Sequence, residues 1–201
     1  MKKVTFIRHG RKDGELIAAD QLTEIQNNGI NGLNGFLQPG QEIVIGLGSE
    51  LVRTQQTIEA FQAYMEKNGF IPAQILAPEK RFGNAELFNK MVSNEALMAE
   101  VKISGWYSAL CSLEPKLLES IQEDQFSALQ AIFEVIKDND VDITIGHTPM
   151  IELLAIYVDA KDSFFRNKSF GIPESLSLKE LQGVEFSQDD DDIIHVTGLL
   201  G

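Results

Sequence analysis

An arginine, a histidine and a glycine stand together directly after a short apolar run near the N-terminus. The apolar residues 4–7 are β-branched or aromatic, a composition that predicts a buried strand, and Arg8, His9 and Gly10 follow without a spacer. Open α/β sheets bind ligands at the carboxyl ends of their strands, and a glycine there lets a ligand approach the backbone closely. Because an imidazole can act as a nucleophile, we expect His9 to attack a phosphoryl group.

A second block places another cation near a predicted strand end. Residues 43–47 form an apolar run that predicts a strand. Ser49 follows and is a favourable N-cap for a helix predicted over about residues 50–67. Arg53 then lies in the first turn of that helix, close to the end of the preceding strand.

A third strand is predicted over residues 142–146, and it runs directly into His147, Thr148 and Pro149. Threonine suits the N-cap and proline the first position of the helix that is expected to follow, to about residue 158. Because the carboxyl ends of parallel strands lie along one edge of a sheet, the cationic side chains of all three blocks are expected to converge.

The converging side chains could bind a phosphate dianion without a metal ion. Arg8 and Arg53 would supply forked donors that match phosphate oxygens, and His147 would supply one more donor. The helix beginning at Thr148 would add a free backbone N–H and the positive end of its dipole. The sequence therefore predicts a phosphate site with neither metal nor cofactor.

The three blocks resemble the signature of the histidine phosphatase superfamily, which includes the cofactor-dependent phosphoglycerate mutases. Arg8-His9-Gly10 matches the first block of that family. Residues 49–57 are similar to its second block, except that Glu50 replaces the usual proline. Gly-His-Thr-Pro at 146–149 is nearest to the phosphohistidine-phosphatase-like branch. The resemblance implies a three-layer α/β/α fold with a mainly parallel central sheet, like that of phosphoglycerate mutase.

The resemblance also implies roles for the site residues. His9 would form a phosphohistidine, while Arg8, Arg53 and His147 would hold the equatorial oxygens of the phosphoryl group, aided by the N–H of Thr148. The family needs an acid to protonate the leaving oxygen.

Two glutamates are candidates for that acid. Several family members place it in Glu-x-x-Phe/Tyr-Gly, a pattern that residues 79–83 fit, so Glu79 is the first choice. Glu86 aligns with a glutamate found a little further along in many relatives and is the alternate.

These features favour a metal-independent phosphatase that acts on a phosphomonoester or a phosphoprotein. One alternative is phosphoryl transfer of the phosphoglycerate mutase type. Another, from a different class, is a catalytically silent module that binds a phosphorylated ligand. A protein phosphohistidine as the substrate would rest on the block at 146–149 alone.

Composition narrows the partners and the compartment. The net charge of −13 argues against nucleic acid or an anionic membrane as a partner. There is no run of about 18 apolar residues, and the N-terminal run is too short and polar for a secretory signal. The single cysteine, Cys111, fits a reducing, cytoplasmic compartment, and it lacks the arginine six residues later that a cysteine-dependent phosphatase requires. The sequence carries no signal for the oligomeric state.

The alternation of predicted strands and helices is typical of an α/β fold. The length of 201 residues suits one domain over residues 1–201, with a helical insertion expected around 78–125. A capping box starting at Thr23 predicts a helix to about Phe36.

The C-terminal part shows short apolar alternations at 175–180, 184–186 and 193–196, which suggest a strand or hairpin with its tip near 188–192. His195 lies in this pattern without a matching block, and we expect it to be structural.

Overall fold

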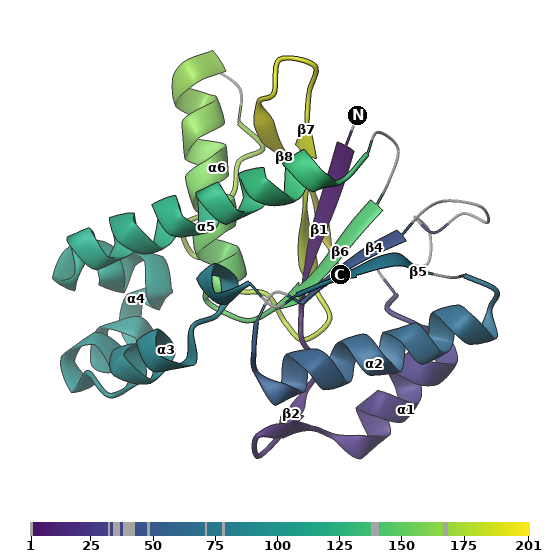
Figure 1. Ribbon diagram of the computed structural model, residues 1–201. Helices are drawn as coiled ribbons and strands as arrows, with labels where there is room; N and C mark the ends of the chain where they lie inside the picture. Colours follow the sequence, from purple (N-terminus) through teal and green to yellow (C-terminus); the bar gives the residue numbers. More distant parts are fainter. Residues whose placement is uncertain are drawn as a thin grey trace.

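The computed structural model describes residues 2–201 except 32, 34–36, 38–42, 48, 71, 78, 138–140, 167 and 168. Among the described residues, six strands form one sheet in the order β5-β4-β6-β1-β7-β8 (Figure 1). Strands β5, β4, β6 and β1 are parallel, and β7 and β8 add antiparallel strands at one side. The strands are β1 (Lys2–Arg8), β4 (Ile43–Leu47), β5 (Pro72–Leu76), β6 (Val141–Gly146), β7 (Gly183–Gln188) and β8 (Ile194–Leu200). The predicted mainly parallel sheet is confirmed.

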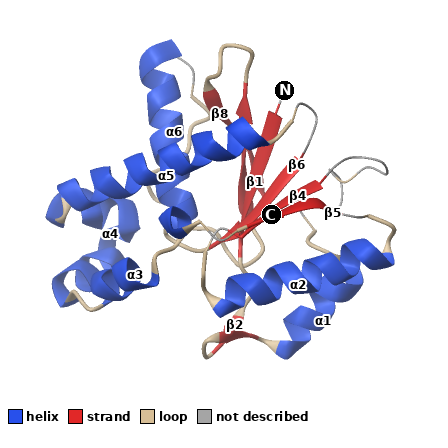
Figure 2. Cartoon of the chain, viewed as in Figure 1, coloured by secondary structure: helices blue, strands red, loops and turns tan. Residues whose placement is uncertain are grey.

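Helices cover both faces of the sheet, because successive side chains of a strand point to opposite faces and both sets are apolar. In β1, Val4 and Phe6 pack into a core with α5 and α6, whereas Ile7 packs into a second core with α1 and α2. Figure 2 shows these two helical layers on either side of the strands. The helices are α1 (Ala19–Asn28), α2 (Val52–Lys67), α5 (Pro115–Val135) and α6 (Met150–Arg166). The predicted three-layer arrangement is confirmed, and no described helix is both long and apolar enough to cross a membrane.

Helices also occupy much of the region around 78–125. After a short 3₁₀ turn (Lys80–Phe82), α3 (Ala85–Val92) and α4 (Glu95–Leu113) build a third apolar cluster with the first turns of α5 and α6. Asn84 and Asn94 cap the two helices by accepting backbone N–H bonds. Gly105 interrupts α4 with φ 82°, a conformation that glycine adopts without steric cost. This helical layer forms one wall of the cavity described below.

The predicted start of the first helix is wrong. α1 begins at Ala19, so Thr23 lies inside it and its hydroxyl donates to the carbonyl of Ala19 at 3.0 Å. A two-stranded ribbon, β2 (Lys12–Asp13) and β3 (Leu16–Ile17), brings the chain back early enough for the helix to begin upstream of the capping signal. The helix ends at Asn28, and the predicted end near Phe36 lies outside the described residues.

Two other predicted caps are also wrong. Ser49 accepts the N–H of Leu51 at 3.1 Å, a local turn that delays the start of α2 to Val52. α6 begins two residues after Thr148, whose hydroxyl donates to Glu152 instead of capping the helix. In both cases a side chain expected to bond a helix terminus has another partner.

The predicted C-terminal hairpin is confirmed as β7 and β8, with its tip at residues 189–193. The alternation at 175–180 does not form a strand, because the backbone of this segment bonds to side chains of other elements. His195 of β8 binds Asp162 of α6 at 2.7 Å and Asp189 of the hairpin tip at 3.0 Å. It thus joins two elements of the fold, as a structural role requires.

Candidate active site

The two site histidines directly follow two neighbouring strands, at equivalent positions along the edge of the sheet. Arg8 of β1 is in register with Gly146 of β6, so the next residues, His9 and His147, follow side by side at the carboxyl edge of the sheet. The backbone N–H of His9 also donates to the carbonyl of Gly146 at 2.9 Å. Parallel pairing therefore places the two imidazoles close together, as the strand-end argument predicts.

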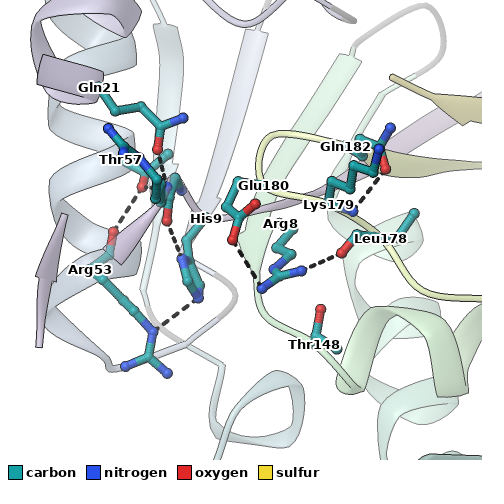
Figure 3. A network of polar contacts seen from close by, with 12 residues as sticks. Arg8, His9, Gln21, Arg53, Thr57, Thr148, Leu178, Lys179, Glu180 and Gln182 are labelled. Atoms are coloured by element: carbon teal, nitrogen blue, oxygen red, sulfur yellow. Dashed lines mark hydrogen bonds and ion pairs between the residues drawn. The ribbon is translucent and has the colours of Figure 1, made fainter. Parts of the chain in front are cut away.

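The hydrogen bonds of His9 determine its tautomer. Its Nδ1 lies 2.6 Å from the carbonyl oxygen of Gly10, which can only accept, so Nδ1 carries the proton. Its Nε2 lies 3.0 Å from Nε of Arg53, which can only donate, so Nε2 carries the lone pair. Figure 3 shows this pair of contacts between the end of β1 and the start of α2.

The surroundings of His9 keep the imidazole neutral at physiological pH. The side chain is buried, and this burial lowers the pKa of His9 to about 4; the bond to Gly10 opposes the change, and the charges of Arg53 and Arg8 add to it. A neutral imidazole with a free lone pair is the nucleophilic form of histidine.

Arg53 is anchored to the turn after His9 by a buried threonine. The hydroxyl of Thr57 donates to the carbonyl of Arg53 at 2.8 Å and accepts the backbone N–H of Gly10 at 3.1 Å. Burial lowers the pKa of Arg53, and the nearby charge of Arg8 lowers it further, so both guanidinium groups would gain from a bound anion. Sequence reasoning missed the role of Thr57, although it is the last residue of the second block.

His147 lies deeper than His9 and is packed on two sides. It is 1% exposed, and within the described residues neither ring nitrogen has a hydrogen-bond partner. The ring of Phe88 lies 5.6 Å from it, centroid to centroid, and a Cβ built on Gly83 would come within 2.9 Å of its Cε1. Burial lowers the pKa of His147 to about 3, and the charges of His9, Arg53 and Arg8 contribute. His147 thus lies beside Arg8, Arg53 and His9 as a neutral imidazole, and its two ring nitrogens are buried without a hydrogen-bond partner among the described residues.

Arg8 is held by the segment at 175–180, which the sequence did not link to the site. Its Nη1 donates to the carbonyl of Leu178, and its Nη2 lies 3.4 Å from Oε1 of Glu180. Its buried Nε has no hydrogen-bond partner among the described residues. Figure 3 shows Arg8 between Leu178 and Glu180, with Thr148 nearby. Of the five N–H donors of Arg8, one is bonded to Leu178 and one is loosely paired with Glu180, so the guanidinium keeps further donors on Nη1 and Nη2.

Glu152 connects the start of α6 to the loop that holds Arg8. It is 3% exposed, and its Oε1 accepts both the hydroxyl of Thr148 at 2.9 Å and the N–H of Leu178 at 3.0 Å. Burial raises the pKa of Glu152, although these hydrogen bonds and the charge of Arg8 oppose the change. Thr148 is thus fixed near Arg8 by a buried carboxyl group rather than by a helix cap.

A cavity of about 360 Å³ opens next to Arg8 and Thr148. Trp106 and Tyr107 of α4 line it together with the loop at 174–177. This volume lies within the usual range for small-molecule sites. In the parts of the chain that the structure describes, no group of three or more His, Cys, Asp or Glu side chains could hold a metal ion.

Of the two predicted proton donors, Glu79 is bound to another side chain and Glu86 is exposed. The carboxylate of Glu79 forms a two-pronged pair with Arg81 at 2.9 and 2.7 Å, and this hydrogen bonding lowers the pKa of Glu79. Glu86 is exposed in the first turn of α3, where its backbone N–H binds the side chain of Asn84. The structure thus brings Arg8, His9, Arg53 and His147 together, while the assignment of the acid stays a prediction.

Comparisons with known proteins agree with this fold. No family profile and no curated protein sequence matches the chain. Among solved structures, a candidate phosphohistidine phosphatase, SixA, from Nakamurella multipartitia matches at 13% identity with a TM-score of 0.58, over 100% of this chain and 95% of that chain. A mycobacterial glucosyl-3-phosphoglycerate phosphatase, solved with VO3, matches at 11% identity with a TM-score of 0.57, over 98% of both chains. The chain therefore has the fold of the histidine phosphatase superfamily, and the resemblance is confirmed at the level of the fold.

Proposed function

We propose that this chain is a metal-independent phosphatase that hydrolyses a phosphomonoester, or a phosphoprotein, through a phosphohistidine on Nε2 of His9. The observation that carries the proposal is the lone pair on Nε2, which lies against Arg53 in a site that also holds Arg8 and His147. Two solved structures of the same fold are named as phosphatases, which supports a reaction of this class.

Substrate binding would require Arg53 to change partners. In the free site the Nε–H of Arg53 donates a hydrogen bond to the lone pair on Nε2 of His9, the proposed nucleophile. A phosphoryl group between Arg8 and Arg53 offers charged oxygens, which are stronger acceptors for a guanidinium than a neutral imidazole. The exchange would move the Arg53 N–H onto a phosphoryl oxygen and expose Nε2 to phosphorus at the same time.

In the first step, Nε2 of His9 attacks phosphorus, the bond from phosphorus to the leaving oxygen breaks, and an acid protonates that oxygen. Arg8, Arg53 and a ring N–H of His147 would stabilise the charge on the equatorial oxygens. The bond from Nδ1 to the carbonyl of Gly10 holds the ring in place and stabilises the positive charge that the imidazole gains.

In the second step, water attacks the phosphohistidine and the phosphorus–nitrogen bond breaks. The carboxylate formed in the first step takes a proton from the water, so the acid is restored. The products are the free alcohol and inorganic phosphate. Analysis of the products separates this hydrolysis from mutase-type transfer, which returns a phosphorylated isomer instead of inorganic phosphate.

Glu79 and Glu86 are the acids that the family resemblance suggests. Glu79 lies on the same segment as Gly83, whose backbone packs against His147, and it would have to leave Arg81 to act. That same ion pair favours a second candidate function, a silent module that binds a phosphorylated ligand with Arg8, Arg53 and His147. Such a module would accumulate phosphohistidine or bind the ester without releasing inorganic phosphate.

The proposed activity is tested by incubating the protein with a chromogenic phosphomonoester in EDTA. Wild type should release inorganic phosphate, and His9→Asn should reduce the rate to the uncatalysed background. His195→Asn is the matched control, because His195 lies outside the site, and this variant should keep its activity. A requirement for added metal, or full activity in His9→Asn, would rule out the mechanism.

A further inference from the structure

The turn that precedes β7 brings a carboxylate into the site. Oε1 of Glu180 lies 3.4 Å from Nη2 of Arg8, and Figure 3 shows Glu180 at the strand ends between Arg8 and His9. Among the carboxylates of the described chain, Glu180 is the one whose negative charge acts on the pKa of His9. Glu180 is therefore close to both the proposed nucleophile and a proposed phosphate ligand.

The backbone of this turn is bonded to Arg8 itself. The N–H of Leu181 donates to the carbonyl of Arg8 at 3.1 Å, and the N–H of Arg8 donates to the carbonyl of Gln182 at 2.8 Å. The turn is closed by the N–H of Gln182 on the carbonyl of Lys179 at 3.1 Å and by the Gln182 side chain on the N–H of Lys179 at 2.8 Å. These hydrogen bonds thus fix the position of Glu180 relative to the end of β1.

Leu181 adopts a strained conformation in this turn. Its φ of 61° lies in the left-handed region, which branched side chains rarely occupy. Such strain costs on the order of 1–3 kcal/mol and is concentrated at functional sites, where the surrounding structure maintains it. Here the four hydrogen bonds of the turn maintain it, and the result is the placement of the preceding residue, Glu180, beside His9.

The accessibility of Glu180 suits a group that exchanges protons with water. Its side chain is 38% exposed and has one long ion-pair contact. Glu152, the other carboxyl group close to Arg8, is buried and commits an oxygen to Thr148 and the backbone of Leu178. Glu79 is bound by Arg81 through both oxygens. Of the candidate acids, Glu180 combines proximity to His9 with access to solvent.

We infer that Glu180 is the proton donor of the proposed phosphatase reaction, an inference that rests on the proposed function. When the phosphoryl dianion binds, Nη2 of Arg8 moves from Glu180 to a phosphoryl oxygen. Glu180 is then released from its cationic partner and faces the phosphoryl group. Its proton goes to the leaving oxygen as the bond to phosphorus breaks, and its carboxylate later takes the proton of the attacking water. The other titratable and charged groups around it are Arg8, His9 and, beyond Arg8, Glu152.

The inference is tested with Glu180→Gln on three esters with progressively poorer leaving groups: 4-nitrophenyl, phenyl and ethyl phosphate. An acid matters most when the leaving oxygen is most basic. We expect kcat/KM to fall about 10²–10⁴-fold on ethyl phosphate and less than about 10-fold on 4-nitrophenyl phosphate. Glu180→Asp should recover part of the loss on ethyl phosphate. Glu119→Gln, an exposed change on α5, is the matched control and should leave all three rates unchanged.

The same three esters are measured with Glu79→Gln and Glu86→Gln. An equal loss on all esters in Glu180→Gln would mean that Glu180 only positions Arg8, and a leaving-group-dependent loss in Glu79→Gln or Glu86→Gln would transfer the role to that residue. Either outcome overturns the inference while the proposed phosphatase function survives. If folded wild type hydrolyses none of the esters, the proposed function itself fails, and the role of Glu180 fails with it.

Discussion

Nε of Arg53 lies 3.0 Å from Nε2 of His9, so an arginine holds the lone pair of the proposed nucleophile in the free site. Arginine cannot accept a hydrogen bond, and this contact therefore requires an unprotonated Nε2. In the proposed mechanism the same side chain would bind the phosphoryl oxygens, so one residue would keep the nucleophile unprotonated before binding and stabilise charge after it.

Replacing Arg53 should impair both of these roles. We expect Arg53→Ala to lower kcat/KM for a phosphomonoester about 10²–10³-fold, in the range seen when one transition-state donor is removed. Arg53→Lys should also be impaired, because a single ammonium cannot reproduce the planar fork of a guanidinium. Arg11→Lys, an exposed exchange outside the proposed phosphate site, serves as the control. Full activity in Arg53→Lys would contradict the proposed double role.

The three histidines of the chain should titrate in two separate ranges. Burial lowers the pKa of His9 to about 4 and that of His147 to about 3. For His195, burial opposes the charged form, but the hydrogen bonds to Asp162 and Asp189 outweigh it and raise the pKa above the usual value. NMR titration of the imidazole Cε1–H signals measures all three. Titration of His9 near its ordinary value of about 6.5 would contradict the neutral, desolvated nucleophile.

These pKa shifts also determine whether the stability of the protein rises or falls as the pH is lowered. Because His9 and His147 have lowered pKa values in the folded protein, the unfolded chain binds more protons between about pH 4 and 6.5, and their contribution to stability falls as the pH drops. His195 acts in the opposite sense, since its raised pKa adds stability that is lost as the pH rises through the folded value. Urea unfolding of His195→Asn should therefore show a larger loss of stability at pH 5.5 than at pH 8.5.

Gly83 has no side chain, and Ser49 and His147 occupy the space that a side chain at this position would need. A Cβ at this position would lie 2.6 Å from Cβ of Ser49 and 2.9 Å from Cε1 of His147, distances that force the neighbours to move. Because displacements of about 1 Å at a reacting centre can cost about 10²-fold in rate, we expect Gly83→Ala to lower kcat/KM roughly 10–100-fold. Gly198→Ala is the control, since its nearest neighbour would be 3.6 Å away. An unimpaired Gly83→Ala enzyme would show that the position of His147 is not critical.

Asp142 is buried in β6 and should make stability depend on pH. Burial raises its pKa from 3.8 to about 7, against the hydrogen bond that Thr144 donates to it at 2.7 Å. A raised folded pKa means that stability is lost as the pH rises from about 4 to 7. Asp142→Asn removes this titration, so the variant should gain roughly 2–4 kcal/mol relative to wild type between pH 4 and pH 8.

Urea denaturation at several pH values measures this difference for Asp142→Asn. Asp124→Asn, an exposed change on α5, should show no comparable trend. If the stabilities of wild type and Asp142→Asn stay parallel across that range, the carboxyl group is not desolvated as the structure indicates.

The parts of the site that could be predicted from sequence are those encoded by local patterns. An apolar run followed at once by Arg8 and His9, or by His147, defines a strand end and its reactive side chain within a few residues. Parallel pairing then brings those ends together, which is a property of the fold class. The helix caps at Thr23 and Ser49 were predicted wrongly because their hydroxyls have other local partners. Thr23 donates to the carbonyl of Ala19 within α1, and Ser49 accepts the N–H of Leu51 in a short turn.

The parts that could not be predicted depend on pairing between distant segments. Glu180 and Leu178 reach Arg8 only because β7 lies antiparallel to β1, and about 170 residues separate the partners. No spacing in the sequence encodes that contact. The same reason explains why Glu152 was not recognised as the residue that fixes Thr148, since its role depends on the loop that also carries Leu178.

The most direct measurement of the central claim is to trap the covalent intermediate. Wild type is mixed with a phosphomonoester and quenched rapidly in alkali, where phosphohistidine survives, and its peptides are then analysed by mass spectrometry. We expect one added phosphoryl group on the peptide that contains His9, formed and lost at rates that match turnover, and absent in His9→Asn. Turnover without a phosphorylated His9, or phosphate found on another residue, would contradict it.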